Sequence, residues 1–172
     1  MIKKSFLVLV LFFFYVSNSY AESTNFIDFT KVLNNSKAGA AAQIKLKKQY
    51  ESESEKFNKE NINIKKEETK IIAEKKSITN EEYLKKVNAL RQKVVDLQKK
   101  KQESFKNIAS SRNNAKQALL KEVNPIVKKY MEDNNIRLVL DKKAIILGDT
   151  TLEITDKIIK ILNQQVSSLK FN

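Results

Sequence analysis

The chain has 172 residues, and its 33 Lys and Arg against 20 Asp and Glu give a formal net charge of +13. It contains no His and no Cys, which excludes Ser-His-Asp and Cys-His nucleophiles, His-based zinc sites and thiol redox chemistry. The only glycines, Gly39 and Gly148, lie too far apart for a Walker A or Rossmann phosphate loop. We therefore expect no enzymatic activity, no cofactor, no metal site and no use of ATP.

The first 21 residues are typical of a cleavable secretory signal peptide. Lys3 and Lys4 precede an apolar run at 6–16, and the small-x-small cleavage site at 19–21 is followed by Glu22. As a helix the apolar run reaches only about 16 Å, roughly half of the hydrocarbon core, which argues against a permanent anchor. Cleavage removes 21 residues and two positive charges, so we expect a soluble protein in an exported compartment.

The segment after the signal peptide is predicted to form the first part of a small body. Residues 25–29 are rich in aromatic and branched side chains and predict a short strand. Thr30 is expected to cap a single helical turn, and Ser36 to cap a long helix that begins at Ala38. Gly39 lies in the first turn of that helix, where the missing side chain allows another backbone to approach closely.

The region from residue 40 to residue 124 contains no glycine and no proline. Its apolar residues recur at near-heptad spacing, which predicts either one long helix or two helices folded back as a hairpin. Residues 44–123 hold 21 Lys and Arg against 12 Asp and Glu, an excess that attracts polyanions, anionic lipid surfaces and acidic chains. The acids alternate with lysines, so i,i+4 pairing explains them better than catalysis by paired carboxylates.

A turn signal inside this region favours the hairpin. Thr79 and Glu82 have the spacing of a capping box, which places the tip near residues 78–82. Folding back there pairs two heptad patterns, but only one of the two usual seam columns in the outgoing helix is apolar. The predicted seam residues are Tyr50, Phe57, Ile64, Ile71, Ile78, Tyr83, Leu90 and Leu97.

The returning helix is predicted to enter the body with a kink at Pro125 and to stop at Asn134-Asn135. Two short apolar runs, at 136–140 and 144–147, then predict a β-hairpin. Thr155 is expected to cap a last amphipathic helix. One face of that helix carries the apolar residues Ile158, Ile159, Leu162, Val166 and Leu169.

We therefore predict an α+β fold, mostly helical, in which a long antiparallel helical-hairpin arm at 43–124 projects from a β-containing body. The body comprises residues 22–42 and 125–172. A body of this size is too small to close a core around several exposed strand edges, so we expect it to self-associate.

Two segments of the body resemble a known family. Residues 26–39, FIDFTKVLNNSKAG, resemble the opening of the Skp/OmpH family of periplasmic chaperones. Residues 135–141, NIRLVLD, followed by LEITD at 152–156, resemble its closing pattern of strand, strand and helix, and Pro125 is also a familiar feature. The resemblance covers the whole chain after the signal peptide, but only these two segments are specific.

The resemblance implies a jellyfish-shaped homotrimer with three helical tentacles around a cavity. It also implies an ATP-independent holdase that keeps unfolded outer-membrane β-barrel proteins soluble in the periplasm. The oligomerisation residues that it suggests in the body are Phe26, Ile27, Phe29, Val32, Leu33, Leu138, Val139, Leu140 and Ile145.

Some members of the family are credited with binding lipopolysaccharide through basic residues, but no such motif matches this chain residue by residue. The candidate contacts with clients or anionic surfaces near the arm tip are Lys75, Lys76, Lys85, Lys86 and Lys93. Such lysines are more often simply solubilising.

Two other functions fit part of the sequence. A structural coiled-coil adaptor of the cell envelope is the alternative, although a narrow, half-polar seam offers little surface for a fixed partner. Nucleic-acid binding is suggested by charge alone, and the export signal and the absence of any groove-reading motif argue against it.

Overall fold

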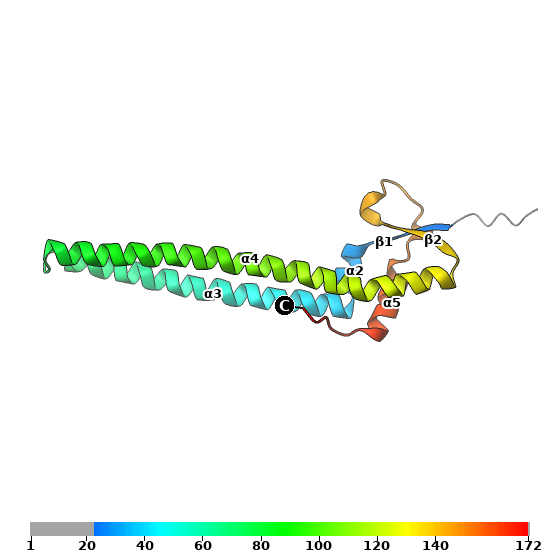
Figure 1. Ribbon diagram of the computed structural model, residues 1–172, viewed down its shortest axis with the longest axis horizontal. Coiled ribbons are helices and arrows are strands. Elements are labelled where there is room, and N and C mark those ends of the chain that lie inside the picture. Colours follow the sequence, from blue (N-terminus) through cyan, green and yellow to red (C-terminus); the bar gives the residue numbers. More distant parts are fainter. Residues whose placement is uncertain (1–22, 172) are drawn as a thin grey trace, which may run out of the picture.

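The computed structural model describes residues 23–171, with the side chain of Ser23 excepted, so the predicted signal peptide lies outside the described residues. A long two-helix arm projects from a small body (Figure 1). Within the described part, no helix is long and apolar enough to cross a membrane. The elements are β1 (Ser23–Ile27), α2 (Phe29–Asn35), α3 (Lys37–Glu74), α4 (Asn80–Asp133), β2 (Ile136–Asp141), two 3-10 turns (Lys142–Ala144 and Thr150–Leu152) and α5 (Thr155–Gln165).

The body contains a two-stranded parallel sheet. β1 pairs with β2 so that Phe26 lies opposite Leu140 and Ile27 opposite Asp141. On its other side Phe26 forms an isolated parallel bridge with Glu153, and its carbonyl accepts a hydrogen bond from the amide of Ile154 at 3.0 Å. The first strand is therefore held between two segments that follow it by more than a hundred residues.

The predicted β-hairpin at 136–140 and 144–147 is wrong in its second half. The Asp141 carboxylate accepts a hydrogen bond from the Lys143 amide at 3.0 Å and starts a 3-10 turn instead of a hairpin turn. The chain then leaves the sheet, and the side chains of Ile146 and Leu147 are fully exposed in the single chain.

The short helix α2 begins two residues earlier than predicted. Its N-cap is Asp28 and not Thr30, because the Asp28 carboxylate accepts a hydrogen bond from the Lys31 amide at 2.8 Å. Phe29, predicted to end the strand, is consequently the first residue of the helix. A carboxylate is an effective N-cap because it accepts from an amide that the helix leaves without a partner.

A tight joint connects α2 to the arm. Ser36 ends α2 and caps α3, as predicted, and its buried hydroxyl accepts a hydrogen bond from the Gly39 amide at 3.1 Å. A Cβ on Gly39 would lie 2.2 Å from the carbonyl oxygen of Leu33, which is closer than any real contact. The close backbone approach predicted at Gly39 is therefore present, and it fixes the angle between the two helices.

The hydrophobic core of the body forms where α2, α4 and α5 meet the sheet. Val32 of α2, Leu119 of α4, and Ile158 and Leu162 of α5 have no exposed surface. α4 runs through Pro125 as one helix and turns slightly in this region (Figure 1). It ends at Asp133, directly before the predicted stop at Asn134-Asn135.

The last helix differs in two ways from its prediction. It begins at Thr155, which does not cap it: the Thr155 hydroxyl accepts from the Asp28 amide at 2.9 Å and donates to Glu153 at 2.8 Å. It also ends at Gln165, so Val166 and Leu169 lie in a tail beyond it. The Thr155 hydroxyl is bound instead to the amide of Asp28, the residue that follows the first strand.

The tail at 166–171 runs back along the root of α3 (Figure 1). Leu169 and Phe171 pack against a small cluster of Ala42, Leu46 and Ala115. The Lys45 ammonium lies 3.1 Å from the Phe171 carbonyl oxygen and 4.4 Å from the centre of its ring. The end of the described chain therefore braces the arm where it leaves the body.

Candidate functional site: the helical arm

The arm is a hairpin of two antiparallel helices whose turn spans residues 75–79. Thr79 and Glu82 form the predicted capping box: the Thr79 hydroxyl accepts from the Glu82 amide at 3.2 Å, and the Glu82 carboxylate accepts from the Thr79 amide at 3.1 Å. Because α3 already ends at Glu74, Ile78 lies in the turn and not in a helix. The start of α4 depends on two residues only three positions apart, so it can be predicted from the local sequence.

The seam between the helices is only partly closed. Phe57, Ile71 and Leu97 of the predicted seam are at most 5% exposed, and Ile108 joins them. Tyr50 is 48% exposed. The predicted seam residues that are half-buried are Ile64, Ile78, Tyr83 and Leu90.

Aromatic side chains occupy the part of the seam closer to the body. The ring of Phe105 lies 5.9 Å from that of Tyr50 and 6.3 Å from that of Phe57, measured between ring centres. Phe105 is nevertheless 43% exposed. Such tilted pairs stabilise the contact between the helices while leaving ring surface in water.

Ion pairs join the two helices along one edge of the arm, which we call the ion-pair edge. Glu67 pairs with Lys93 at 2.7 Å, and Glu74 pairs with Lys86. The hydrogen bond from Lys86 is the main cause that lowers the pKa of Glu74. These contacts specify the register of the hairpin but add little to its stability, because exposed ion pairs contribute little to the free energy of unfolding.

The five candidate lysines near the tip consequently fall into two groups. Lys86 and Lys93 are neutralised by carboxylates of the facing helix, a pairing that the sequence analysis missed. Lys75 is exposed and lies over the ring of Tyr83, 5.4 Å from its centre. Lys76 and Lys85 are exposed and form no ion pair with another described residue. The open positive charge of the tip therefore belongs to three residues.

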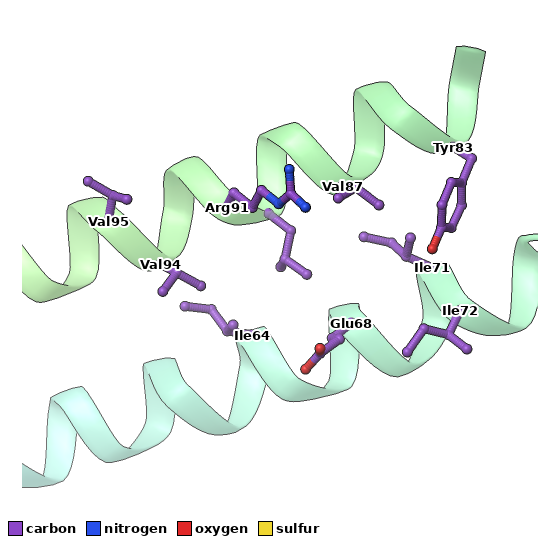
Figure 2. A pocket seen from close by; sticks show the side chains of 10 residues that line it. Ile64, Glu68, Ile71, Ile72, Tyr83, Val87, Arg91, Val94 and Val95 are labelled. Carbon is purple, nitrogen blue, oxygen red and sulfur yellow. The ribbon is translucent and has the colours of Figure 1, made fainter. Parts of the chain in front are cut away.

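The other edge of the arm carries a groove of about 610 Å³, which we call the arm groove. Figure 2 shows side chains of both helices pointing toward a common hollow. Ile72 is 60% exposed and Val95 47% exposed beside it. The groove residues are Ile64, Glu68, Ile71, Ile72, Tyr83, Val87, Leu90, Arg91, Val94 and Val95.

Sequence reasoning found the seam members of this groove but missed its rim. Ile72 and Arg91 each follow a predicted seam residue directly, and Val95 follows Val94, which continues the same apolar pattern four residues after Leu90. A search for apolar residues adjacent to heptad positions would have found Ile72 and Val95.

A second, smaller groove of about 350 Å³ lies on the body between the sheet and α4. Ile27 and Phe29 line it together with Leu138, Val139 and Leu140, so it gathers five of the predicted oligomerisation residues. Phe26, Val32 and Leu33 belong instead to the interior of the same chain or its margin, and Ile145 is half-buried.

Neither region has the features of a metal centre. Among residues 23–171 no group of three or more His, Cys, Asp or Glu side chains is arranged to hold a metal ion. The arm itself presents basic charge, exposed apolar side chains and length.

Comparisons with known proteins agree with this architecture. Residues 24–162 match the family described as outer membrane protein (OmpH-like). A crystal structure from Caulobacter crescentus CB15, provisionally assigned as an outer membrane chaperone (OmpH-like), superimposes with a TM-score of 0.81 at 19% identity, covering 92% of this chain and 95% of that chain. At that identity the likeness shows a shared fold. A comparison with curated proteins finds no similar sequence.

The family match extends over both body segments and the whole arm, and the shared fold includes the long hairpin. The chain belongs to the OmpH-like family of outer membrane proteins.

Proposed function

We propose that this protein is an ATP-independent holdase chaperone, which holds unfolded outer-membrane β-barrel proteins between basic helical arms and delivers them for outer-membrane assembly. The observation that carries the proposal is an arm that exposes apolar and basic side chains side by side over its length. Membership of the OmpH-like family and the assignment of the Caulobacter protein support it.

The physical basis of holding is weak attraction at many points. The arm region has 21 Lys and Arg against 12 Asp and Glu, so its field draws in acidic segments over a distance of about 10 Å at moderate salt. Exposed apolar residues such as Ile44, Ile62 and Val95 then provide short-range contact. Contacts of this kind are individually weak, so the client is released without hydrolysis.

The proposed location is the periplasm. The predicted signal peptide at residues 1–21 and the family support it. A client on its way to the outer membrane is unfolded in that compartment and needs protection from aggregation there.

The proposed assembly is a homotrimer built through the body, with the number three resting on the family resemblance. Ile146 and Leu147 are 104% and 93% exposed, next to a sheet of only two strands. Parallel sheets are normally covered on both faces, so a neighbouring copy would complete this one. Replacing both residues by aspartate should dissociate the assembly in sedimentation, whereas Leu84→Asp at the arm tip, a control with 50% exposure, should not.

The open lysines Lys75, Lys76 and Lys85 are the proposed contacts with lipopolysaccharide or another anionic membrane surface. A variant with all three replaced by glutamine should bind less to vesicles containing phosphatidylglycerol. Equal binding by the variant and the parent protein would remove these lysines from the proposal.

The experiment that tests holding dilutes a urea-unfolded β-barrel protein into buffer with the purified protein, without ATP, and follows light scattering. We expect scattering to be suppressed, and the suppression to weaken but persist at moderate salt because of the apolar component. Undiminished aggregation at equimolar assembly would overturn the chaperone proposal and leave the structural adaptor as the better explanation.

A further inference from the structure

The two edges of the arm near its tip differ in the state of their charged groups. On the ion-pair edge, Glu67 and Glu74 are bound to lysines of α4. On the edge with the arm groove, Glu68 of α3 and Arg91 of α4 line the groove from its two helices, and neither forms an ion pair or side-chain hydrogen bond with another described residue (Figure 2). The carboxylates of Glu67 and Glu74 on the first edge already have partners, whereas the second edge holds a hydrogen-bond acceptor, Glu68, and a donor, Arg91, that are available to a ligand.

Apolar side chains lie between these two open groups. Ile71 at 5% exposure belongs to the closed part of the seam, whereas Val94 is 40% exposed and Val95 47% exposed. Figure 2 shows the side chains of Val87, Ile64 and Val94 directed toward the hollow. The groove therefore has an apolar lining with a carboxylate on one side and a guanidinium on the other.

This combination is complementary to an extended polypeptide backbone. An extended chain presents N–H donors and C=O acceptors along its edges, while its side chains alternate between two faces. A carboxylate accepts from N–H groups, and a guanidinium donates to carbonyl oxygens in charge-assisted hydrogen bonds. Alternate apolar side chains of the same segment can enter the lining between them.

We propose that the arm groove of a single hairpin binds a short extended segment of an unfolded polypeptide, with Glu68 and Arg91 contacting its backbone. Ile64 to Ile72 on α3 span about 12 Å along the helix axis, which matches about four residues of extended chain. The inference rests on the proposed holdase function, and it deepens that function by placing a client contact within each arm.

The first test measures binding of a fluorescein-labelled ten-residue peptide that alternates valine or tyrosine with threonine, using fluorescence anisotropy. Arg91→Glu should weaken binding about tenfold, because it removes the donor and adds a second carboxylate to the groove that Glu68 already lines. Arg112→Glu makes the same chemical change on the same helix, outside the groove, and should leave binding unchanged. Equal loss in both variants would show that bulk charge accounts for binding and would overturn the proposal.

The second test uses the full protein with a urea-unfolded β-barrel client. A photo-crosslinking amino acid at Val95, on the groove rim, should capture the client, and the same group at Ala89, exposed on another face of α4, should capture much less. If the parent protein suppresses aggregation but position 95 captures no more than position 89, the groove is not the contact and the holdase function stands. If the parent protein does not suppress aggregation, the holdase function fails, and the peptide measurement alone decides on the groove.

Discussion

The body buries its apolar side chains, whereas the arm leaves many of its apolar side chains exposed. In the body, Val32 and Leu162 come from opposite ends of the described chain and have no exposed surface. In the arm, Ile72 and Val95 are 60% and 47% exposed although they lie beside the seam. The difference indicates a division of work, in which the body provides stability and the arm keeps surface available for contact.

The largest expected effect is on the body core. Leu162→Ala should lower the free energy of unfolding by about 4 kcal/mol, because a core fixed by three helices and a sheet cannot collapse around the cavity. Leu97→Ala removes the same atoms from the arm seam. There the two helices can move closer to each other and fill part of the cavity, so the free energy of unfolding should fall by only about 2 kcal/mol. Urea unfolding followed by circular dichroism measures both values. Equal costs would contradict the division between body and arm.

The next effect concerns the joint between the two regions. Gly39→Ala should destabilise the protein by about 1–3 kcal/mol, because the new Cβ would meet the Leu33 backbone at 2.2 Å. Gly148→Ala is the matched control, since its Cβ would find its nearest neighbour at an ordinary 3.4 Å. We expect that control to change the unfolding free energy by less than about 1 kcal/mol. Thermal unfolding of the two variants side by side tests the comparison.

The smallest effect is on the arm tip and depends on pH. The pKa of Glu74 is lowered below its ordinary value of 4.5, mainly by the hydrogen bond from Lys86. The contribution of ionised Glu74 to the stability of the arm tip is therefore present at neutral pH. It is lost as pH falls below 4.5 through the lowered pKa. Amide hydrogen-exchange protection near residues 74 and 86 should decrease on acidification. Measuring single residues matters here, because Glu153 in the body also has a lowered pKa, caused first by Thr155 and then by Lys142.

A matched variant separates Glu74 from the other acids. Glu74→Gln should show at neutral pH the lower tip protection that the parent protein shows only in acid. Tip protection that still decreases with acid in this variant would assign the effect to another carboxylate.

Features with a local cause could be predicted from the sequence. The capping box of Thr79 and Glu82, the N-cap at Ser36 and the close approach at Gly39 each depend on neighbours within six residues. The mostly helical fold with a small sheet also follows from the heptad spacing and from the strand patterns at 25–29 and 136–140. The N-cap of α2 was harder to predict, because Asp28 and Thr30 are both residue types that cap helices. Which of them caps α2 depends on where the preceding strand ends.

Features with a distant cause could not be predicted in this way. The strand partner of β1 is β2, more than a hundred residues away, and nothing in either segment specifies a parallel pairing. The run at 145–147, which is exposed at Ile146 and Leu147, has the composition of a strand but lies outside the sheet of its own chain. The ion pairs of Lys86 and Lys93 depend on the register of the hairpin, which the heptad pattern alone leaves open.

The joint at Ser36–Gly39 gives the arm a mechanical property. α3 has 38 residues and is about 57 Å long, so a rotation of one degree at its root displaces the tip by about 1 Å. The backbone contact between Gly39 and Leu33 and the tail contact between Lys45 and Phe171 both lie at the fixed end of this lever. Small rotations at the root of α3 are therefore magnified along the arm. The position of the tip depends on a few residues at the root, far from the tip itself.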